Sequence, residues 1–482
     1  QELGRDEAAV RDFSLAIERA PDGVTHLARS RSWQALSQPE AALIDLDCAI
    51  RSEPDLTAAY YARARVYQDH GNPGGALADL SRAIELTPDD PQAWVARGLV
   101  LAGQGALHAA EEDFLLALSI DETNRDAHFQ LGLLAKTQGD LELAITGFTR
   151  VVDFWPEDAA AFYERALVHY QLADYASARA DCTRAIALDP DLARAFELRG
   201  RVHDTEGRID EALKDYLQLV SLEPARAEAY RLCGLAWHKH GQYSEALADF
   251  DLAVDLDKNE PATYLNRGDT YWTLGRLTEA VGDYTSAINL GHGGTISIQA
   301  HYGRAMAYHN LGRIEEAVAD YNVVIQADPE YAAAHFNRGL ALYALQRFDK
   351  ARGDFDYLLD RNPQDVESLV ARGGILHWQG RLQEALADFG AAIRLHPAAN
   401  TFFNRGRTYL RMNQPEKALA DFHAARDLDP AYLPAYLEIG ALLCNIGAYQ
   451  EALPYLIKAA PLSDPRVVQY TTLARQMLGL IP

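Results

Sequence analysis

The feature that most constrains this chain is a sequence unit that recurs about every 34 residues along its length. The segments that begin at Asp12, Asp79, Asp181 and Asp421 read DFSLAIERAPD, DLSRAIELTPD, DCTRAIALDPD and DFHAARDLDPA. The equivalent first residues lie at 45, 79, 113, 147, 181, 215, 249, 283, 320, 354, 388, 421 and 455. Short units repeated thirteen times predict a stack of small modules, each of which buries its apolar surface against its neighbours.

The residue types within the unit predict a helical hairpin. We number each unit from 1 to 34, so that the aligned residue is at position 23. Apolar residues recur at helical spacing over positions 1–14 and 16–30. Nine units have Gly at position 15, which suits a left-handed turn, and nine have Pro at position 32, which cannot continue a helix. Position 20 is always Ala and position 8 is always Gly, Ala or Ser, so two helix axes can approach to about 8–10 Å there.

The third unit shows this pattern most completely, as W-x-x-R-G followed by A-x-x-D-F-x-x-A. The residues concerned are Trp94, Arg97, Gly98, Ala110, Asp113, Phe114 and Ala117. The pattern resembles the tetratricopeptide repeat, and the resemblance covers nearly the whole chain. It implies an all-α fold, a right-handed superhelical solenoid of antiparallel helix hairpins. It also implies that the first helices line a concave groove, in which such proteins mostly bind segments of other proteins.

The register divides the chain into three parts. Residues 1–21 are predicted to be a partial repeat that holds a second helix only, residues 22–462 to be thirteen tandem repeats, and residues 463–482 to be a capping helix. Because the first helix of the partial repeat is missing, we expect the natural sequence to continue before Gln1. The GHGG segment at 291–294 lies where the repeat gains three residues, and we interpret it as a flexible connector rather than a phosphate-binding loop.

Position 7 carries an unexpected charge. It is Arg in ten of the thirteen units, and each of those ten also has Asp at position 23. Units four and thirteen lose both residues together, with Leu131 and Gly147 in one and Ile439 and Tyr455 in the other. We infer an Arg–Asp pair inside each of the ten hairpins, with two parallel hydrogen bonds where the geometry allows. A ladder of charges for ligands is the alternative.

From unit eight to unit twelve, the positions that should face the groove become aromatic. These residues are Leu265, Trp272, Tyr302, His309, Phe336, Tyr343, His377, Trp378 and Phe403. Aromatic side chains that a core does not need are enriched at interaction surfaces, so we predict a partner-binding groove here. Self-packing of the superhelix, or of a homo-oligomer, remains the alternative. Asn266, Asn337 and Asn404 at position 6 suggest a second alternative, an incomplete version of the asparagine ladder found in some tetratricopeptide solenoids of a glycosyltransferase.

Composition excludes several classes of function. The chain has 69 acidic and 45 basic residues, a net charge of −24, which disfavours nucleic acid as a partner. No segment is apolar enough to predict a membrane span. Its four cysteines, Cys48, Cys182, Cys233 and Cys444, show no disulfide or zinc spacing, and no catalytic, metal or cofactor motif occurs. We therefore expect a cytoplasmic protein that is not an enzyme.

The sequence thus predicts a non-catalytic scaffold that binds peptide or protein segments in its concave groove. The alternative function is the substrate-recognition arm of a larger enzyme, for example a glycosyltransferase, with its catalytic domain outside this chain.

Overall fold

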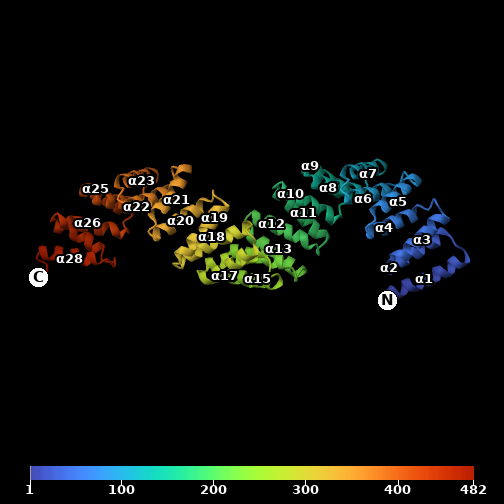
Figure 1. The fold of residues 1–482 in the computed structure, drawn as a ribbon, viewed down its shortest axis with the longest axis horizontal. Helices are drawn as coiled ribbons and strands as arrows, with labels where there is room; N and C mark the ends of the chain where they lie inside the picture. The colour runs from blue at the N-terminus through green and yellow to red at the C-terminus, as the bar shows by residue number, and fades with distance from the viewer. Residues whose placement is uncertain (1, 482) are drawn as a thin grey trace. The chain divides into compact units, whose positions relative to one another are not determined.

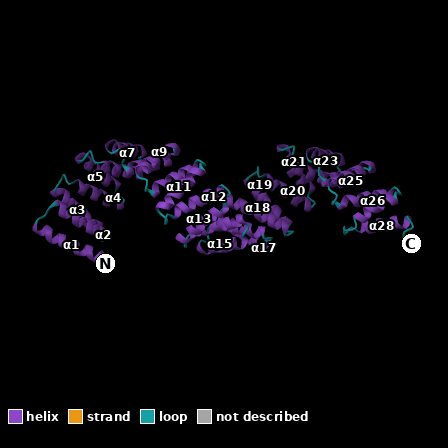
Figure 2. Cartoon of the chain, turned by 180° about the vertical axis from the view of Figure 1, so that it is seen from behind, coloured by secondary structure: helices purple, strands orange, loops and turns teal. Residues whose placement is uncertain are grey.

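The structure is a computed structural model that describes residues 2–481, and every regular element in that range is an α-helix (Figure 2). The helices form two compact units, Gln1–His240 and Gly241–Pro482. The repeat register did not predict this division, which falls inside the seventh repeat.

The first unit contains α1 (Glu2–Arg19), α2 (Gly23–Ala35), α3 (Pro39–Ser52), α4 (Thr57–Asp69), α5 (Pro73–Leu86), α6 (Pro91–Gly103), α7 (Leu107–Ile120), α8 (Arg125–Gln138), α9 (Leu141–Phe154), α10 (Ala159–Gln171), α11 (Tyr175–Leu188), α12 (Ala193–Thr205), α13 (Ile209–Leu222) and α14 (Ala227–His240). The second unit contains α15 (Tyr243–Leu256), α16 (Pro261–Thr273), α17 (Leu277–Leu290), α18 (Thr295–Asn310), α19 (Ile314–Ala327), α20 (Ala332–Ala344), α21 (Phe348–Arg361), α22 (Val366–Trp378), α23 (Leu382–Leu395), α24 (Ala399–Arg411), α25 (Pro415–Leu428), α26 (Leu433–Asn445), α27 (Tyr449–Lys458) and α28 (Pro465–Met477). Within each unit, helices that follow one another in the chain pack side by side (Figure 1).

Small residues at positions 8 and 20 and a large apolar residue at position 24 let the two helices of each hairpin pack closely. In the third repeat, Ala110 is fully buried and Phe114 is 1 % exposed between α6 and α7. A Cβ atom added to Gly98 would lie only 2.6 Å from Cε1 of Phe114, so the ring occupies the space that a side chain at position 8 would need. The packing of Phe114, at position 24, against the small residues at positions 8 and 20 therefore holds the two helices together.

The turn between the two helices is left-handed in all thirteen repeats, including those that lack glycine. Ser37, Ala173, Gln346 and Asn413 take the place of glycine at position 15 and have φ between 55° and 59°. Left-handed backbone costs an ordinary residue about 1–2 kcal/mol. The packing of the hairpin, rather than the residue at the turn, thus dictates the backbone conformation there.

The ten predicted Arg–Asp pairs are all present inside their hairpins. In the third repeat, Nε of Arg97 donates to Oδ2 of Asp113 and Nη2 donates to Oδ1, both at 2.8 Å. None of the ten aspartate side chains is more than 9 % exposed. The pairs are Arg29–Asp45, Arg63–Asp79, Arg97–Asp113, Arg165–Asp181, Arg199–Asp215, Arg267–Asp283, Arg304–Asp320, Arg338–Asp354, Arg372–Asp388 and Arg405–Asp421.

The same arginines also bind the preceding hairpin, a role that the pairing pattern did not reveal. Nη1 of Arg63 donates to Asp47 at 2.6 Å, and Nη1 of Arg372 donates to Asp356 at 2.8 Å. In nine of the ten cases the acceptor is a polar side chain at position 25 of the previous repeat. The acceptors are Ser14, Asp47, Ser81, Thr149, Thr183, Asp251, Thr285, Asn322 and Asp356.

The sequence carries a signal for this second bond. Position 25 is Leu115 in the repeat before Leu131, and Leu217 in the repeat before Cys233. Position 7 lacks arginine in three repeats, and position 25 of the preceding repeat is Leu in two of these cases; the third, His423 before Ile439, is an exception. A second exception is Gly390, which precedes Arg405 and has no side chain to accept a bond.

Residues 291–294 connect two helices, as the sequence predicts, but the three additional residues of this repeat do not lengthen the connector. They make a link of four residues between α17 and α18, the same length as the 257–260 link between α15 and α16. The three additional residues instead lengthen α18, which has 16 residues against 13 in α16. Ile296 in the added turn packs against the buried core around Tyr284 and Ala300, so the insertion adds apolar contact.

At each end of the described part of the chain, a helix packs against the neighbouring hairpin. α1 packs along α2, and α28 packs on both α26 and α27. Val467 and Ala474 of α28 are buried in one apolar cluster with Ile439 and Leu456. The N-terminus of α28 is capped by the side chain of Asp464, which accepts a hydrogen bond from the backbone of Arg466. The helix therefore shields the apolar end of the last hairpin from water.

Gly147 provides a test of the hairpin packing. A Cβ at this position in α9 would lie 2.9 Å from Cα of Gly132 in α8, whereas a Cβ at Gly282 in α17 would meet no atom within 4 Å. Alanine is favoured over glycine inside a helix by about 1 kcal/mol. We expect Gly282→Ala to slow amide exchange in α17, and Gly147→Ala to accelerate exchange in α8 and α9 because the helices must separate. Slower exchange in both variants would contradict the close contact of α8 with α9.

Arg405 and Asp421 provide the cleanest test of the ion pairs, because Arg405 has no position-25 acceptor in the preceding repeat. Removing one partner of a buried pair costs roughly 3–5 kcal/mol, and Arg405, with a side chain 22 % exposed, belongs at the lower end of that range. We expect Asp421→Ala to destabilise α24 and α25 strongly in native-state amide exchange. The double change Arg405→Ile with Asp421→Tyr copies the residue types of the thirteenth repeat and should restore most of the loss.

The single and double variants of this pair separate two explanations. If the double variant is as unstable as Asp421→Ala, the loss comes from the packing of the aspartate side chain and not from an unpaired arginine.

Candidate functional site

The first helices of the second unit form the surface on which the predicted residues lie. α16 contacts α18, α18 contacts α20, α20 contacts α22 and α22 contacts α24, in addition to the contacts of each with its own hairpin partner. We call the outward side of these five helices the first-helix face. All nine predicted groove residues belong to these helices.

Seven of the nine residues line one of three cavities on this face. Leu265, Trp272 and Tyr302 line a cavity of about 510 Å³ between α16 and α18, the α16–α18 cavity. His377, Trp378 and Phe403 line a cavity of about 670 Å³ bounded by α22, α24, α26 and α28, the terminal cavity. Phe336 lines a third cavity, of about 810 Å³, that extends to the 396–401 segment. His309 and Tyr343 line none of these three.

The residues at position 5 are largely used for packing. Leu265 is 9 % exposed and belongs to a buried cluster with Tyr284. Phe336 packs edge-on against Phe355 with ring centroids 5.7 Å apart, and Phe403 packs against Phe422 at 5.5 Å. These rings can offer an edge to a ligand, but their main contacts are inside the hairpin.

Among the predicted residues at positions 12 and 13, the two tryptophans are the exposed ones. Trp272 is 36 % exposed and Trp378 is 55 % exposed. Tyr343 is half-buried and packs against Phe348 of the next helix, with centroids 5.7 Å apart. The sequence pattern treated Trp272, Tyr343 and Trp378 as one class, whereas the structure separates the tryptophans from the tyrosine.

The α16–α18 cavity has aromatic walls and a polar floor. Trp272, Tyr302 and Tyr331 contribute rings, and the hydroxyl of Tyr284 donates to Oδ1 of Asp269 at 2.7 Å. Burial raises the pKa of Tyr284 and the nearby Asp269 carboxylate raises it further, so the phenol stays protonated as a donor. Neither Lys, Arg nor His occurs among the described lining residues.

The three asparagines at position 6, Asn266, Asn337 and Asn404, differ in their contacts. Nδ2 of Asn337 donates to the hydroxyl of Tyr302 at 2.8 Å, which ties it to the neighbouring first helix. Asn266 lines the α16–α18 cavity, whereas the backbone carbonyl of Asn404 accepts a bond from Thr408. Because one of the three side chains already serves a neighbouring hairpin, the spacing does not provide a uniform ladder of amides.

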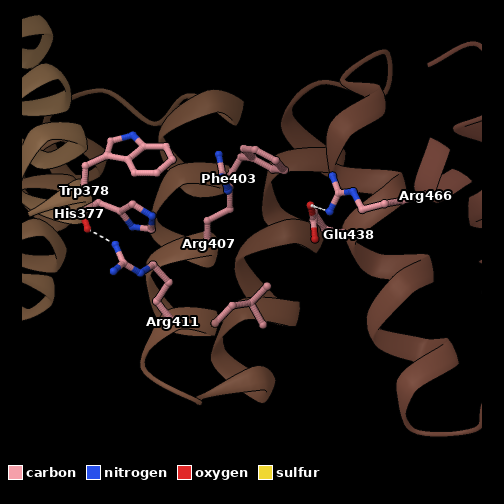
Figure 3. Close-up of a pocket in the computed structure, with 8 residues that line it drawn as sticks. His377, Trp378, Phe403, Arg407, Arg411, Glu438 and Arg466 are labelled. Carbon is pink, nitrogen blue, oxygen red and sulfur yellow. Dashed lines mark hydrogen bonds and ion pairs between the residues drawn. The ribbon is translucent and has the colours of Figure 1, made fainter. Parts of the chain in front are cut away.

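The terminal cavity contains a buried histidine beside an exposed tryptophan (Figure 3). The hydroxyl of Thr408 donates to the carbonyl of Asn404, so its oxygen is left to accept from Nδ1 of His377 at 2.9 Å. Burial lowers the pKa of His377 to about 4, and the positive charges of Arg411 and Arg407 add to that shift. The imidazole is therefore neutral near pH 7, with its proton on Nδ1.

Three arginines give the terminal cavity a positive lining. Nη1 of Arg466, from α28, donates to Oε1 of Glu438 at 3.0 Å, and Nη2 donates to Asp464 at 2.8 Å. Nη1 of Arg411 donates to the backbone carbonyl of His377 (Figure 3). Arg407 lies near the face of the Phe403 ring, with Cζ 6.0 Å from its centroid. The repeat pattern did not predict this cluster, because Arg466 lies outside the repeat register and arginine occurs at the positions of Arg407 and Arg411 in few repeats.

The charged residues on α12 and α14, and in the link just before α14, mainly pair with one another. Nη2 of Arg226 donates to Glu197 at 2.6 Å, and Nη2 of Arg201 bridges Glu197 and Glu228. Nζ of Lys239 on α14 donates to Asp204 on α12. These bonds join neighbouring first helices, so this surface of the first unit is better suited to structure than to ligand binding.

Within residues 2–481, no group of three or more His, Cys, Asp or Glu is arranged to hold a metal ion. The four cysteines are free, and burial raises the pKa of Cys182 to about 12, so its thiol is a poor nucleophile. No helix among the described residues has the length and apolar character needed to cross a membrane.

Several solved structures are similar to this chain. YrrB, described as a tetratricopeptide repeat protein with an unusual peptide-binding site, is 26 % identical over 39 % of this chain and 95 % of its own, with a TM-score of 0.35. A tetratricopeptide repeat protein from Parabacteroides merdae is 24 % identical over 52 % of this chain and 98 % of its own, with a TM-score of 0.43. A chain of the APC/C hetero-tetramer Cut9–Hcn1 is 15 % identical over 98 % of this chain and 93 % of its own, with a TM-score of 0.40.

The sequence profile of the tetratricopeptide repeat matches residues 61–125, 129–193, 198–261, 265–332, 302–366 and 336–400. A second profile of the same repeat matches residues 399–432. These matches cover most of the chain, and the helices of each unit pack in the order that such repeats require. The chain belongs to the tetratricopeptide repeat family, whose members are in general scaffolds for interactions between proteins rather than enzymes.

Proposed function

We propose that this protein is a non-catalytic scaffold that holds a segment of another protein on the first-helix face of its second unit. The observation that carries the proposal is the placement of Trp272 and Trp378. Each is more than a third exposed, and each lines a cavity on that face. Most of the other aromatic residues predicted for this face are drawn into hairpin packing.

The energetic argument follows from the exposed area of the two tryptophans. Covering the exposed part of one of these tryptophans removes on the order of 100 Å² from water, a gain of roughly 2–3 kcal/mol. Tryptophans in pockets are also among the residues that contribute most to protein interfaces. Two such anchors on one face favour a partner segment long enough to reach both cavities.

The chemistry of the chain supports a protein partner. A net charge of −24 opposes binding of a nucleic acid backbone, whereas aromatic cavities suit apolar side chains of a peptide. The four free cysteines fit a reducing compartment such as the cytoplasm. A second copy of the chain is the competing occupant of the same face, and would make the protein a homo-oligomer.

The double variant Trp272→Ala with Trp378→Ala tests this function. Because both side chains are exposed, we expect the thermal midpoint to change little, while capture of the main partner in a pull-down with the intact chain is lost. Trp155→Ala is the matched control, since Trp155 is 50 % exposed but lies in the first unit. That variant should retain capture.

Tyr343→Ala is a second control, which shows the effect of removing an aromatic side chain that contributes to packing, because Tyr343 packs against Phe348. It should lower the midpoint. If the double tryptophan variant lowers the midpoint as much, the tryptophans are structural. If the double variant retains capture, the partner binds elsewhere on the chain.

A further inference from the structure

The terminal cavity is lined mainly by positive charges, although the chain as a whole is acidic. Its charged lining consists of Arg407, Arg411, Arg466 and a single carboxylate, Glu438. The α16–α18 cavity on the same face contains no basic residue among its described lining residues. The positive charge is therefore confined to one end of the first-helix face.

Two of these arginines have no ion pair within the described residues. Arg407 and Arg411 are exposed, and neither lies within 4.0 Å of a carboxylate there. The position-7 arginines behave differently, since all ten have an aspartate partner in their own hairpin. Arg466 does have partners, Glu438 and Asp464, so Glu438 is already occupied and does not neutralise the other two.

Arg407 and Arg411 lie four residues apart on α24, and both line the terminal cavity. Arg411 is held in place by its bond to the backbone carbonyl of His377, which still leaves N–H groups of the guanidinium to donate. Arg407 lies beside the Phe403 ring on the same helix, one turn away. The neutral His377 adds no charge of its own near pH 7, so the field at the cavity comes from the arginines.

We propose that the terminal cavity binds an acidic side chain of the partner segment, with its carboxylate held by Arg407 and Arg411. An apolar side chain next to it in the segment packs on Trp378 and Phe403. This inference rests on the proposed function and adds the chemistry and the direction of the bound segment. The acidic residue lies at the α24 end, and the part of the segment that reaches Trp272 has no acidic preference.

Charge and geometry favour this occupant over others. Arginine forks bind carboxylates through paired, charge-assisted hydrogen bonds. A nucleic acid would bring its remaining phosphates against an acidic protein. An internal acidic side chain, unlike a free carboxyl terminus, lets the segment continue along the face toward α16.

The test uses the intact chain and a library of short random segments displayed between two inert linkers, so that no segment has a free terminus. We expect selected segments to be enriched in Asp or Glu on one side of their apolar anchors. A selected segment made as a synthetic peptide should lose at least tenfold in affinity to the variant Arg407→Gln with Arg411→Gln. Its Gln-for-Glu version should bind the wild-type chain and the variant equally.

Arg394→Gln is the matched control, because Arg394 is an exposed arginine on the second helix α23 and lies outside the cavity. It should bind the peptide like the wild-type chain. The thermal midpoint of each variant shows whether it is folded. In the wild-type chain, NMR titration gives a further readout: the pKa of His377 should rise from about 4 when the acidic peptide is bound, because a nearby anion offsets the field of the arginines.

Three results would overturn the inference. Segments that depend on Trp272 and Trp378 but show no acidic enrichment would refute the anion site and leave the proposed function intact. If no selected segment depends on either tryptophan, the proposed function itself fails. Self-association of the wild-type chain in sedimentation, abolished by the double arginine variant, would show that the occupant is a second copy.

Discussion

The bidentate pair of an arginine at position 7 with an aspartate at position 23 is the interaction on which the rest of each hairpin depends. It holds the first helix against the second with two directed bonds, and the aspartate is buried in every instance. The third guanidinium nitrogen reaches back to the preceding hairpin in nine of the ten cases. One side chain thus sets both the closure of a hairpin and its position against its neighbour.

This dual role explains which parts of the fold the sequence predicts. The pairing inside the hairpin is readable because positions 7 and 23 change together in two repeats. The bond to the previous hairpin is readable only when Leu115 and Leu217 are compared with Leu131 and Cys233 in the following repeats. The added turn of α18 was not predictable from the GHGG segment, because the spacing of the repeat shows that residues are gained but not whether they extend a loop or a helix.

The candidate site was predictable in location but not in detail. Repeat positions identify the first-helix face, since every repeat places the same positions on the same side. They do not tell whether an aromatic ring is exposed, because that depends on the residues packed against it: Tyr343 packs against Phe348, whereas Trp378 remains 55 % exposed. The repeat pattern could not predict the positive lining of the terminal cavity, since Arg466 comes from α28, after the last repeat.

The missing side chain at Gly390 has a consequence for the junction of α22 with α24. Arg405 finds no acceptor there, so the bond that joins other neighbouring hairpins is absent, and this junction instead has the bonds from His377 to Thr408 and from Arg411 to the His377 carbonyl. Both of these bonds lie in the wall of the terminal cavity. A ligand that draws Arg411 toward itself therefore competes with a bond that joins two hairpins, and occupancy of the cavity is mechanically coupled to how firmly the twelfth repeat is held against the eleventh.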